Sequence, residues 1–266
     1  MNSTKFQDIV YKNYKEHGRD YLPWRKTKNP YKVLISEVML QQTQVGRVIQ
    51  KYHDFLKVFP TIQTLAQAPF RTVLTVWQGM GYNRRARYLS DTAKIIVKEH
   101  GGRIPQDMYA LQKLPGIGPA TAAGICIFAF NKPATYIETN VRSVIIHHFF
   151  KHKEQVSDAT IAKVLKRVID TNHPRRWYGA LLDYGKILKK QYNPSTKSAH
   201  YTKQTPFKGS QRELRGKVIT LLTEQPRKMK TLQRILREPL PRLWRVLAAL
   251  DADNLVTLQR GAWRIA

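Results

Sequence analysis

Apolar side chains recur along most of the chain with the spacing of an α-helix. Positions three or four residues apart predict helices around residues 33–45, 73–77, 109–114, 161–168 and 180–188. The alternating pattern of a β-strand does not occur before the last dozen residues. The main body, residues 1–205, is therefore predicted to be all-α.

Residues 211–266 carry a different order of elements. Three short helical patterns, at 214–222, 229–236 and 240–250, precede two short apolar runs that flank Gln259-Arg260-Gly261, a hairpin signal. Three helices and a terminal hairpin predict a small winged-helix domain. Such a domain often places a helix in a DNA groove, and a packing or partner-docking role is the alternative.

The two predicted domains are joined by a basic, polar stretch. Residues 186–217 contain nine Lys or Arg and a single acid, Glu213. The part at 191–210 is predicted to be a connector, either a solvated linker or an arm that follows a DNA backbone.

The net charge of the chain limits the kinds of partner that it can bind. The 266 residues contain 46 Lys and Arg against 18 Asp and Glu, a formal charge of +28. Such a balance indicates a polyanionic partner, and nucleic acid fits best. A hydrophobic content of 42% is enough for a packed core and excludes a disordered or fibrous protein.

Cysteine content and apolar stretches exclude further classes. Cys126 is the one cysteine, which excludes disulfide frameworks, cysteine zinc sites and iron–sulfur clusters held by thiolates. The longest apolar stretch, 116–130, contains a proline and is shorter than the roughly 20 residues of a membrane span. The start of the chain lacks a signal-peptide core. We expect an intracellular monomer with no membrane contact and no metal site, cytoplasmic and nucleoid-associated in a bacterium.

The segment Leu114-Pro115-Gly116-Ile117-Gly118 is the sharpest local motif. It stands between two predicted helices, where two glycines permit a tight turn and leave backbone N–H groups uncovered. Together with the dipole of the following helix, these groups can hold a phosphate. The motif predicts a helix–hairpin–helix that grips DNA without reading sequence.

Two glutamates are candidates for acid–base chemistry. Glu37 lies inside the apolar run 33–40, either on the solvated side of a helix or in a dry pocket that would raise its pKa. Glu138 lies in Tyr136-Ile137-Glu138-Thr139-Asn140, where a helix begins, and a glutamate is also simply favourable there.

These motifs together resemble the helix–hairpin–helix DNA glycosylases, and most closely their adenine DNA glycosylase branch. The resemblance implies an all-α, two-lobed fold, with a central lobe at 29–135 and a second lobe made of 1–28 and 136–190. It also implies that a base flips into the cleft between the lobes. The matching stretches are Leu22–Arg25, Asn29–Tyr31, Ser36–Val45, Trp77–Tyr82, Leu114–Gly118 and Asn140–Val141.

The resemblance also implies roles for single residues. Glu37 corresponds to the acid that protonates adenine, Glu138 to the second carboxylate, and Asn140 to the asparagine that supports it. Trp24, Arg25 and Leu40 would line the base pocket, Gln42 and Thr43 would contact the opposite base, and Tyr82 would wedge into the stack. Gly116, Ile117 and Gly118 would hold phosphate, and Arg84 and Arg85 either contact phosphate or form a solvated face.

The sequence departs from the family pattern in four places. Glu138 and Thr139 replace an Asp-Gly pair, and Ala120 replaces the lysine with which bifunctional relatives cleave the strand. The four cysteines of the iron–sulfur cluster are absent after Gly185, so no cofactor is expected. The family's C-terminal module that reads 8-oxoguanine is also absent, and a winged helix is predicted in its place.

The predicted function is a monofunctional DNA glycosylase of base excision repair. It would act on duplex DNA that contains a mispair, releasing adenine opposite guanine or 8-oxoguanine and leaving an abasic site. One alternative is a thymine or uracil glycosylase for mismatches on the same scaffold. Another is a DNA-structure-binding protein without catalysis, which would not need both carboxylates.

Overall fold

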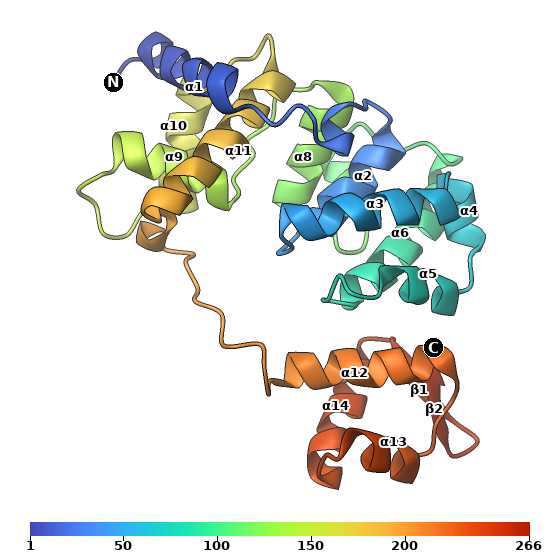
Figure 1. Cartoon of the computed structure of the whole chain (residues 1–266). Helices are drawn as coiled ribbons and strands as arrows, with labels where there is room; N and C mark the ends of the chain where they lie inside the picture. Colours follow the sequence, from blue (N-terminus) through green and yellow to red (C-terminus); the bar gives the residue numbers. More distant parts are fainter. The chain divides into compact units, whose positions relative to one another are not determined.

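The computed structural model describes all 266 residues and is mostly helical (Figure 1). The elements are α1 (Ser3–His17), η1 (Pro23–Arg25), α2 (Pro30–Leu40), α3 (Val45–Val58), α4 (Ile62–Gln67), α5 (Phe70–Trp77), α6 (Arg84–His100), α7 (Met108–Gln112), α8 (Pro119–Phe130), α9 (Thr139–Phe149), α10 (Asp158–Val168), α11 (Pro174–Gln191), η2 (Pro194–Lys197), α12 (Gln211–Glu224), α13 (Met229–Leu236), α14 (Leu240–Ala252), β1 (Val256–Gln259) and β2 (Ala262–Ile265). The prediction of an all-α main body with a small C-terminal winged helix is confirmed. No helix combines the length and apolar character that a bilayer crossing requires.

The chain forms two compact units, each assembled from separate segments. The first unit contains residues 1–37, 105–113 and 117–203, and the second contains residues 38–104, 114–116 and 204–266. These units differ from the predicted lobes because α8 belongs to the first unit. Helix α8 is apolar on every side, and its residues Ala123, Ile127 and Phe128 share one core with Val141 and Trp177.

The core of the first unit is built where α1, α8, α9, α10 and α11 meet. Phe6 of α1 is fully buried and packs edge-on against Trp177 of α11, with ring centroids 5.8 Å apart. Because α1 and α11 are far apart in sequence, this contact fixes the N-terminal helix to the helices that carry the polar groups described below.

The second unit contains helices α3–α6 and the winged helix. Phe55 of α3 packs edge-on against the buried Trp77 at the end of α5. Helix α12 contacts α5, where the Nε of Arg71 donates to the carbonyl of Thr223 at 2.8 Å.

The terminal hairpin has the predicted turn. Strands β1 and β2 pair antiparallel, with Leu258 opposite Trp263 and Gln259 opposite Ala262. Arg260 and Gly261 lie between them with φ of 51° and 73°. Two consecutive left-handed residues are what a two-residue hairpin turn requires.

Candidate active site

Glu37 lies in α2 among buried residues of its own helix. Its side chain is partly exposed, whereas its sequence neighbours Ile35, Ser36, Val38 and Met39 are all buried. Loss of hydration raises the pKa of the Glu37 carboxyl to about 8. The raised pKa favours the dry-pocket interpretation, because a pKa of about 8 favours the protonated form of the carboxyl at neutral pH.

A glycine makes room for this carboxyl. A Cβ placed on Gly124 of α8 would stand 2.1 Å from Oε2 of Glu37, far inside van der Waals contact. Gly124 is buried in the middle of α8, where glycine weakens a helix relative to alanine. Gly124 was not among the predicted site residues, although a glycine inside an apolar helical run was a usable signal.

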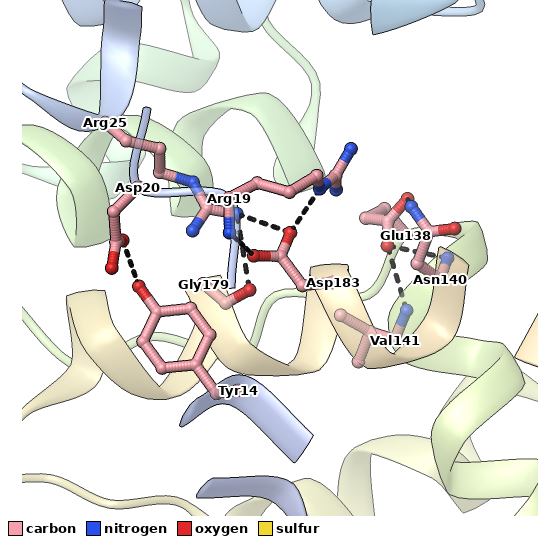
Figure 2. Close-up of polar contacts among 9 residues, drawn as sticks. All are labelled: Tyr14, Arg19, Asp20, Arg25, Glu138, Asn140, Val141, Gly179 and Asp183. Carbon is pink, nitrogen blue, oxygen red and sulfur yellow. Dashed lines mark hydrogen bonds and ion pairs between the residues drawn. The ribbon is translucent and has the colours of Figure 1, made fainter. Parts of the chain in front are cut away.

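Glu138 is held at the beginning of α9 (Figure 2). Its Oε1 accepts hydrogen bonds from the backbone N–H groups of Asn140 at 2.6 Å and Val141 at 2.8 Å. The side-chain amide of Asn140 donates to Oε2 at 3.2 Å. The longer side chain of Glu138 thus folds back to cap its own helix, and Asn140 contacts it as the resemblance implied.

The environment of Glu138 differs in kind from that of Glu37. Burial raises the pKa of Glu138, and the hydrogen bonds from Val141 and Asn140 oppose this because they stabilise the charged form. No such donor bonds to Glu37, whereas the charge of Glu138 raises the pKa of Glu37 further. The hydrogen bonds therefore favour the charged form of Glu138, and the raised pKa of Glu37 favours its protonated form.

Tyr136 and Arg25 share the electrostatic environment of the two carboxyls. Burial, followed by the charges of Glu37 and Glu138, raises the pKa of Tyr136 well above its usual range. The guanidinium of Arg25 acts in the opposite direction on Glu37 and lowers its pKa. Four polar groups from α2, η1 and the segment before α9 thus interact within the first unit.

Arg25 is itself held by a buried aspartate that sequence analysis did not identify (Figure 2). Oδ1 of Asp183, a residue of α11 that is 2% exposed, accepts from Nη2 of Arg25 at 3.3 Å and from Nε of Arg19 at 2.7 Å. A Cβ on Gly179, one turn earlier in α11, would stand 2.6 Å from Arg25. Trp24 beside it is also buried. A buried carboxylate with two arginines fixes the position of the Arg25 side chain.

The second unit contains the residues expected to contact the opposite base and the stacked duplex. Gln42 is exposed and has a left-handed backbone, with φ of 53°, in the loop that follows the half-buried Leu40 at the end of α2. Tyr82 is 39% exposed, also has a positive φ of 47°, and its hydroxyl accepts a hydrogen bond from Gln204 at 3.0 Å. Both side chains stand on sharply turned loops, which suits residues that must project.

The structure corrects the phosphate-contact role that was expected for Arg85. This side chain is 7% exposed, and desolvation lowers the pKa of its guanidinium to about 10. Arg85 thus holds two loops together through buried hydrogen bonds. Arg84, by contrast, is exposed and forms an ion pair with Asp253 of the winged helix. The acceptors of Arg85 are the carbonyls of Val38, Met39, Gln41, Met80 and Gly81 and the hydroxyl of Thr43.

The hairpin segment has the expected turn. Gly116 has φ of 72°, and a Cβ there would stand 2.7 Å from the ring of Tyr88, so the position requires glycine. Ile117 is buried, which leaves its backbone rather than its side chain to contact a ligand. Gly118 is the N-cap residue before α8, and it has open space around its Cα and no side chain to cap the first N–H groups of the helix.

The segment after α11 contains no residues suited to an iron–sulfur cluster. This segment forms the short helix η2. It is joined to residue 156 by a hydrogen bond, in which the N–H of residue 156 donates to the carbonyl of Lys197 at 2.9 Å. The hydroxyl of Tyr192 bonds to the ring of His147, and Nζ of Lys197 donates to the carbonyl of Lys151. Hydrogen bonds within the polypeptide close this segment, and no step of the chemistry below passes through a cluster.

Comparison with known proteins identifies the family to which the chain belongs. Residues 35–171 match the model of the HhH-GPD superfamily of base excision DNA repair proteins, which is more than half of the chain. The chain belongs to this superfamily. The match includes Glu37, Glu138 and the hairpin.

Individual relatives agree with this assignment. The chain is 37% identical over 198 residues to the adenine DNA glycosylase of Buchnera aphidicola (Baizongia pistaciae), covering 73% of this chain and 56% of the relative. It is 35% identical over 146 residues to the thymine/uracil-DNA glycosylase of Pyrobaculum aerophilum, covering 54% of this chain and 64% of the relative. The solved structure of a thermostable thymine-DNA glycosylase superposes with a TM-score of 0.62 at 25% identity, covering 70% of this chain and 86% of that chain. The chain thus spans a little over half the length of the adenine-specific relative.

Proposed function

We propose that the protein is a monofunctional adenine DNA glycosylase that acts as a monomer on adenine opposite guanine or 8-oxoguanine. The observation that carries the proposal is the Glu37 carboxyl beside Gly124, whose pKa is raised to about 8 by desolvation and by the charge of Glu138, the residue that caps α9. Adenine is a poor leaving group until a ring nitrogen is protonated, and a protonated carboxyl is the group that can supply this proton.

The two carboxyls divide the reaction between them. Glu37 donates its proton to the base, and the electron pair of the glycosidic bond leaves with the base. The sugar becomes oxocarbenium-like, and the negative charge of Glu138 stabilises it. A water then adds to C1′ and loses a proton, so the products are free adenine and an abasic site.

Strand cleavage is absent from this proposal because the required amine is absent. Ala120 occupies the second position of α8, where a lysine would form a Schiff base with the sugar. We further propose that the enzyme works without an iron–sulfur cluster, since the segment after α11 contains no cysteine. Purified protein should then show no absorbance band near 400 nm.

DNA contact is proposed for the exposed groups on both units. The charge of +28 supplies sequence-independent affinity, which we expect to fall steeply with salt. Gln42, Thr43 and Tyr82 are proposed to contact the opposite base and the stack, and Gly116, Ile117 and Gly118 to contact phosphate through their backbone.

The decisive test is single-turnover excision on a panel of duplexes. The panel contains adenine opposite guanine, adenine opposite 8-oxoguanine, and thymine or uracil opposite guanine. We expect release of adenine alone, with breakage of the strand only after alkali and no adduct trapped by borohydride. The thymine-DNA and thymine/uracil-DNA relatives make mismatch thymine or uracil the second candidate. Tight binding of the panel without any excision would indicate the DNA-structure-binding alternative.

Substitution of Gly124 by alanine should disable the enzyme while leaving it folded. The added methyl group would displace the Glu37 carboxyl, and a misplacement of about 1 Å in a catalytic group can cost about 100-fold in rate. Gly216→Ala in α12 is the matched control, because a Cβ there meets open space. Single-turnover excision and thermal melting should be compared for both variants, and equal rates would contradict the placement of Glu37.

A further inference from the structure

The winged-helix domain exposes a group of large apolar side chains. Ile235, Leu240, Trp244 and Leu258 are 43%, 40%, 49% and 50% exposed, and they lie within 24 residues of one another in the sequence. Single exposed hydrophobic residues are common on proteins, whereas a cluster of them marks a binding surface.

Helix α14 presents part of this group as a stripe. Leu240, Trp244 and Ala248 are exposed and four residues apart, so they lie along one side of the helix. Val246 on the opposite side of the helix and the flanking Leu243 and Leu247 are buried in the domain. The stripe is therefore not required to hold the winged helix together.

The hairpin extends the stripe. The ring of Trp244 packs edge-on against Trp263 of β2, with centroids 6.0 Å apart. Leu258 lies directly opposite Trp263 in the β1–β2 pairing, and directly opposite residues share one face of a sheet. The contact between Trp244 and Trp263 joins the stripe to the hairpin, and we call Leu240, Trp244, Ala248 and Leu258 together the α14 face.

Cations outnumber acids around the α14 face, although the exposed Asp251 follows Ala248 by three residues. Residues 211–266 contain twelve Lys and Arg against five Asp and Glu. Arg237 before the helix, Arg245 beside Trp244 and Arg260 at the tip of the wing are exposed. The ion pairs of this domain involve other cations, and the nearby Glu238 is already paired with Arg242.

We propose that the α14 face binds a short acidic segment of another protein that carries large apolar side chains. The apolar residues of the segment would cover Trp244 and its neighbours, and its carboxylates would pair with the surrounding arginines. DNA fits this face less well, because reading base edges in a groove needs hydrogen-bonding side chains where α14 presents Leu240 and Ala248.

The test is a selection from a displayed library of random peptides about a dozen residues long, with the full-length protein as bait. We expect enriched peptides to combine Asp or Glu with large apolar residues. Trp244→Ser should weaken their binding about tenfold or more, as truncation of a central aromatic does. Arg245→Glu should also weaken it, and so should added salt. Phe207→Ser, which removes a still more exposed aromatic from the connector, is the control and should bind normally.

Several results would overturn the proposal. These are failure to enrich peptides over the Trp244→Ser protein, enrichment of peptides without acidic residues, and loss of duplex affinity in Trp244→Ser, which would make the face a DNA contact. A concentration-dependent dimer that Trp244→Ser abolishes would instead identify a second copy as the occupant. Base excision by Trp244→Ser should remain at the wild-type rate, so this test is independent of the proposed activity.

Discussion

Glu37→Gln should lower the single-turnover rate of adenine release by about a thousandfold, within the range known for loss of a general acid. Glutamine keeps the shape of the side chain beside Gly124 but holds no proton that it can donate. Duplex affinity should stay within about twofold of wild type, because no phosphate-binding charge is removed. Quenched-flow excision and fluorescence anisotropy measure the two quantities separately.

The same residue sets the expected pH dependence. Because the active form of Glu37 is the protonated one and its pKa is about 8, excision should be constant near pH 7 and fall as pH rises through 8. A raised pKa in the folded protein also means that ionisation opposes folding. The stabilising effect of Glu37 is complete below its unfolded pKa near 4.5 and is lost as pH rises through about 8. Glu37→Gln should therefore increase the melting temperature at pH 9 more than at pH 5.

A surface glutamate provides the control for Glu37. Glu99 lies exposed near the end of α6, and Glu99→Gln should change neither excision nor the pH dependence of melting. Wild-type excision by Glu37→Gln would show that another group donates the proton.

Glu138→Gln should also lower adenine release by about two to three orders of magnitude, because the sugar cation would face a neutral amide. The variant also weakens the cap of α9, at a cost of about 1 kcal/mol in the free energy of unfolding. Excision and chemical denaturation should be measured on the same preparation, so that the loss of rate can be separated from the loss of stability.

Shortening the same side chain tests the departure from the family pattern. Glu138→Asp keeps the charge and offers α9 a good N-cap residue, so excision should stay within about tenfold of wild type. Asp107→Asn removes the charge from the cap of α7 and should leave excision unchanged. A wild-type rate in Glu138→Gln would show that the second carboxylate is not needed.

Local patterns in the sequence were sufficient for much of the fold. The helical spacing of apolar residues predicted the helices, and the three patterns at 214–222, 229–236 and 240–250 lie inside α12, α13 and α14. The turn segment Gln259-Arg260-Gly261 predicted the hairpin, because glycine readily adopts the left-handed backbone that a tight hairpin turn needs. The sequence motifs also singled out Glu37, Glu138 and Asn140, which the structure places in one unit with Arg25.

Other features depended on contacts between distant segments. A glutamate in an apolar run was compatible with a solvated helix side, and only the approach of the Glu37 carboxyl to Gly124 of α8 showed that desolvation raises its pKa to about 8. Arg85 looked like a phosphate ligand, yet it is enclosed by loops that bring six acceptors to it. Asp183 carried no local signal, because its role comes from Arg19 and Arg25, more than 150 positions away. The spacing of apolar residues and the residue types of a turn are properties of neighbouring positions in the sequence. Desolvation and ion pairing instead depend on which surfaces the folded chain brings together.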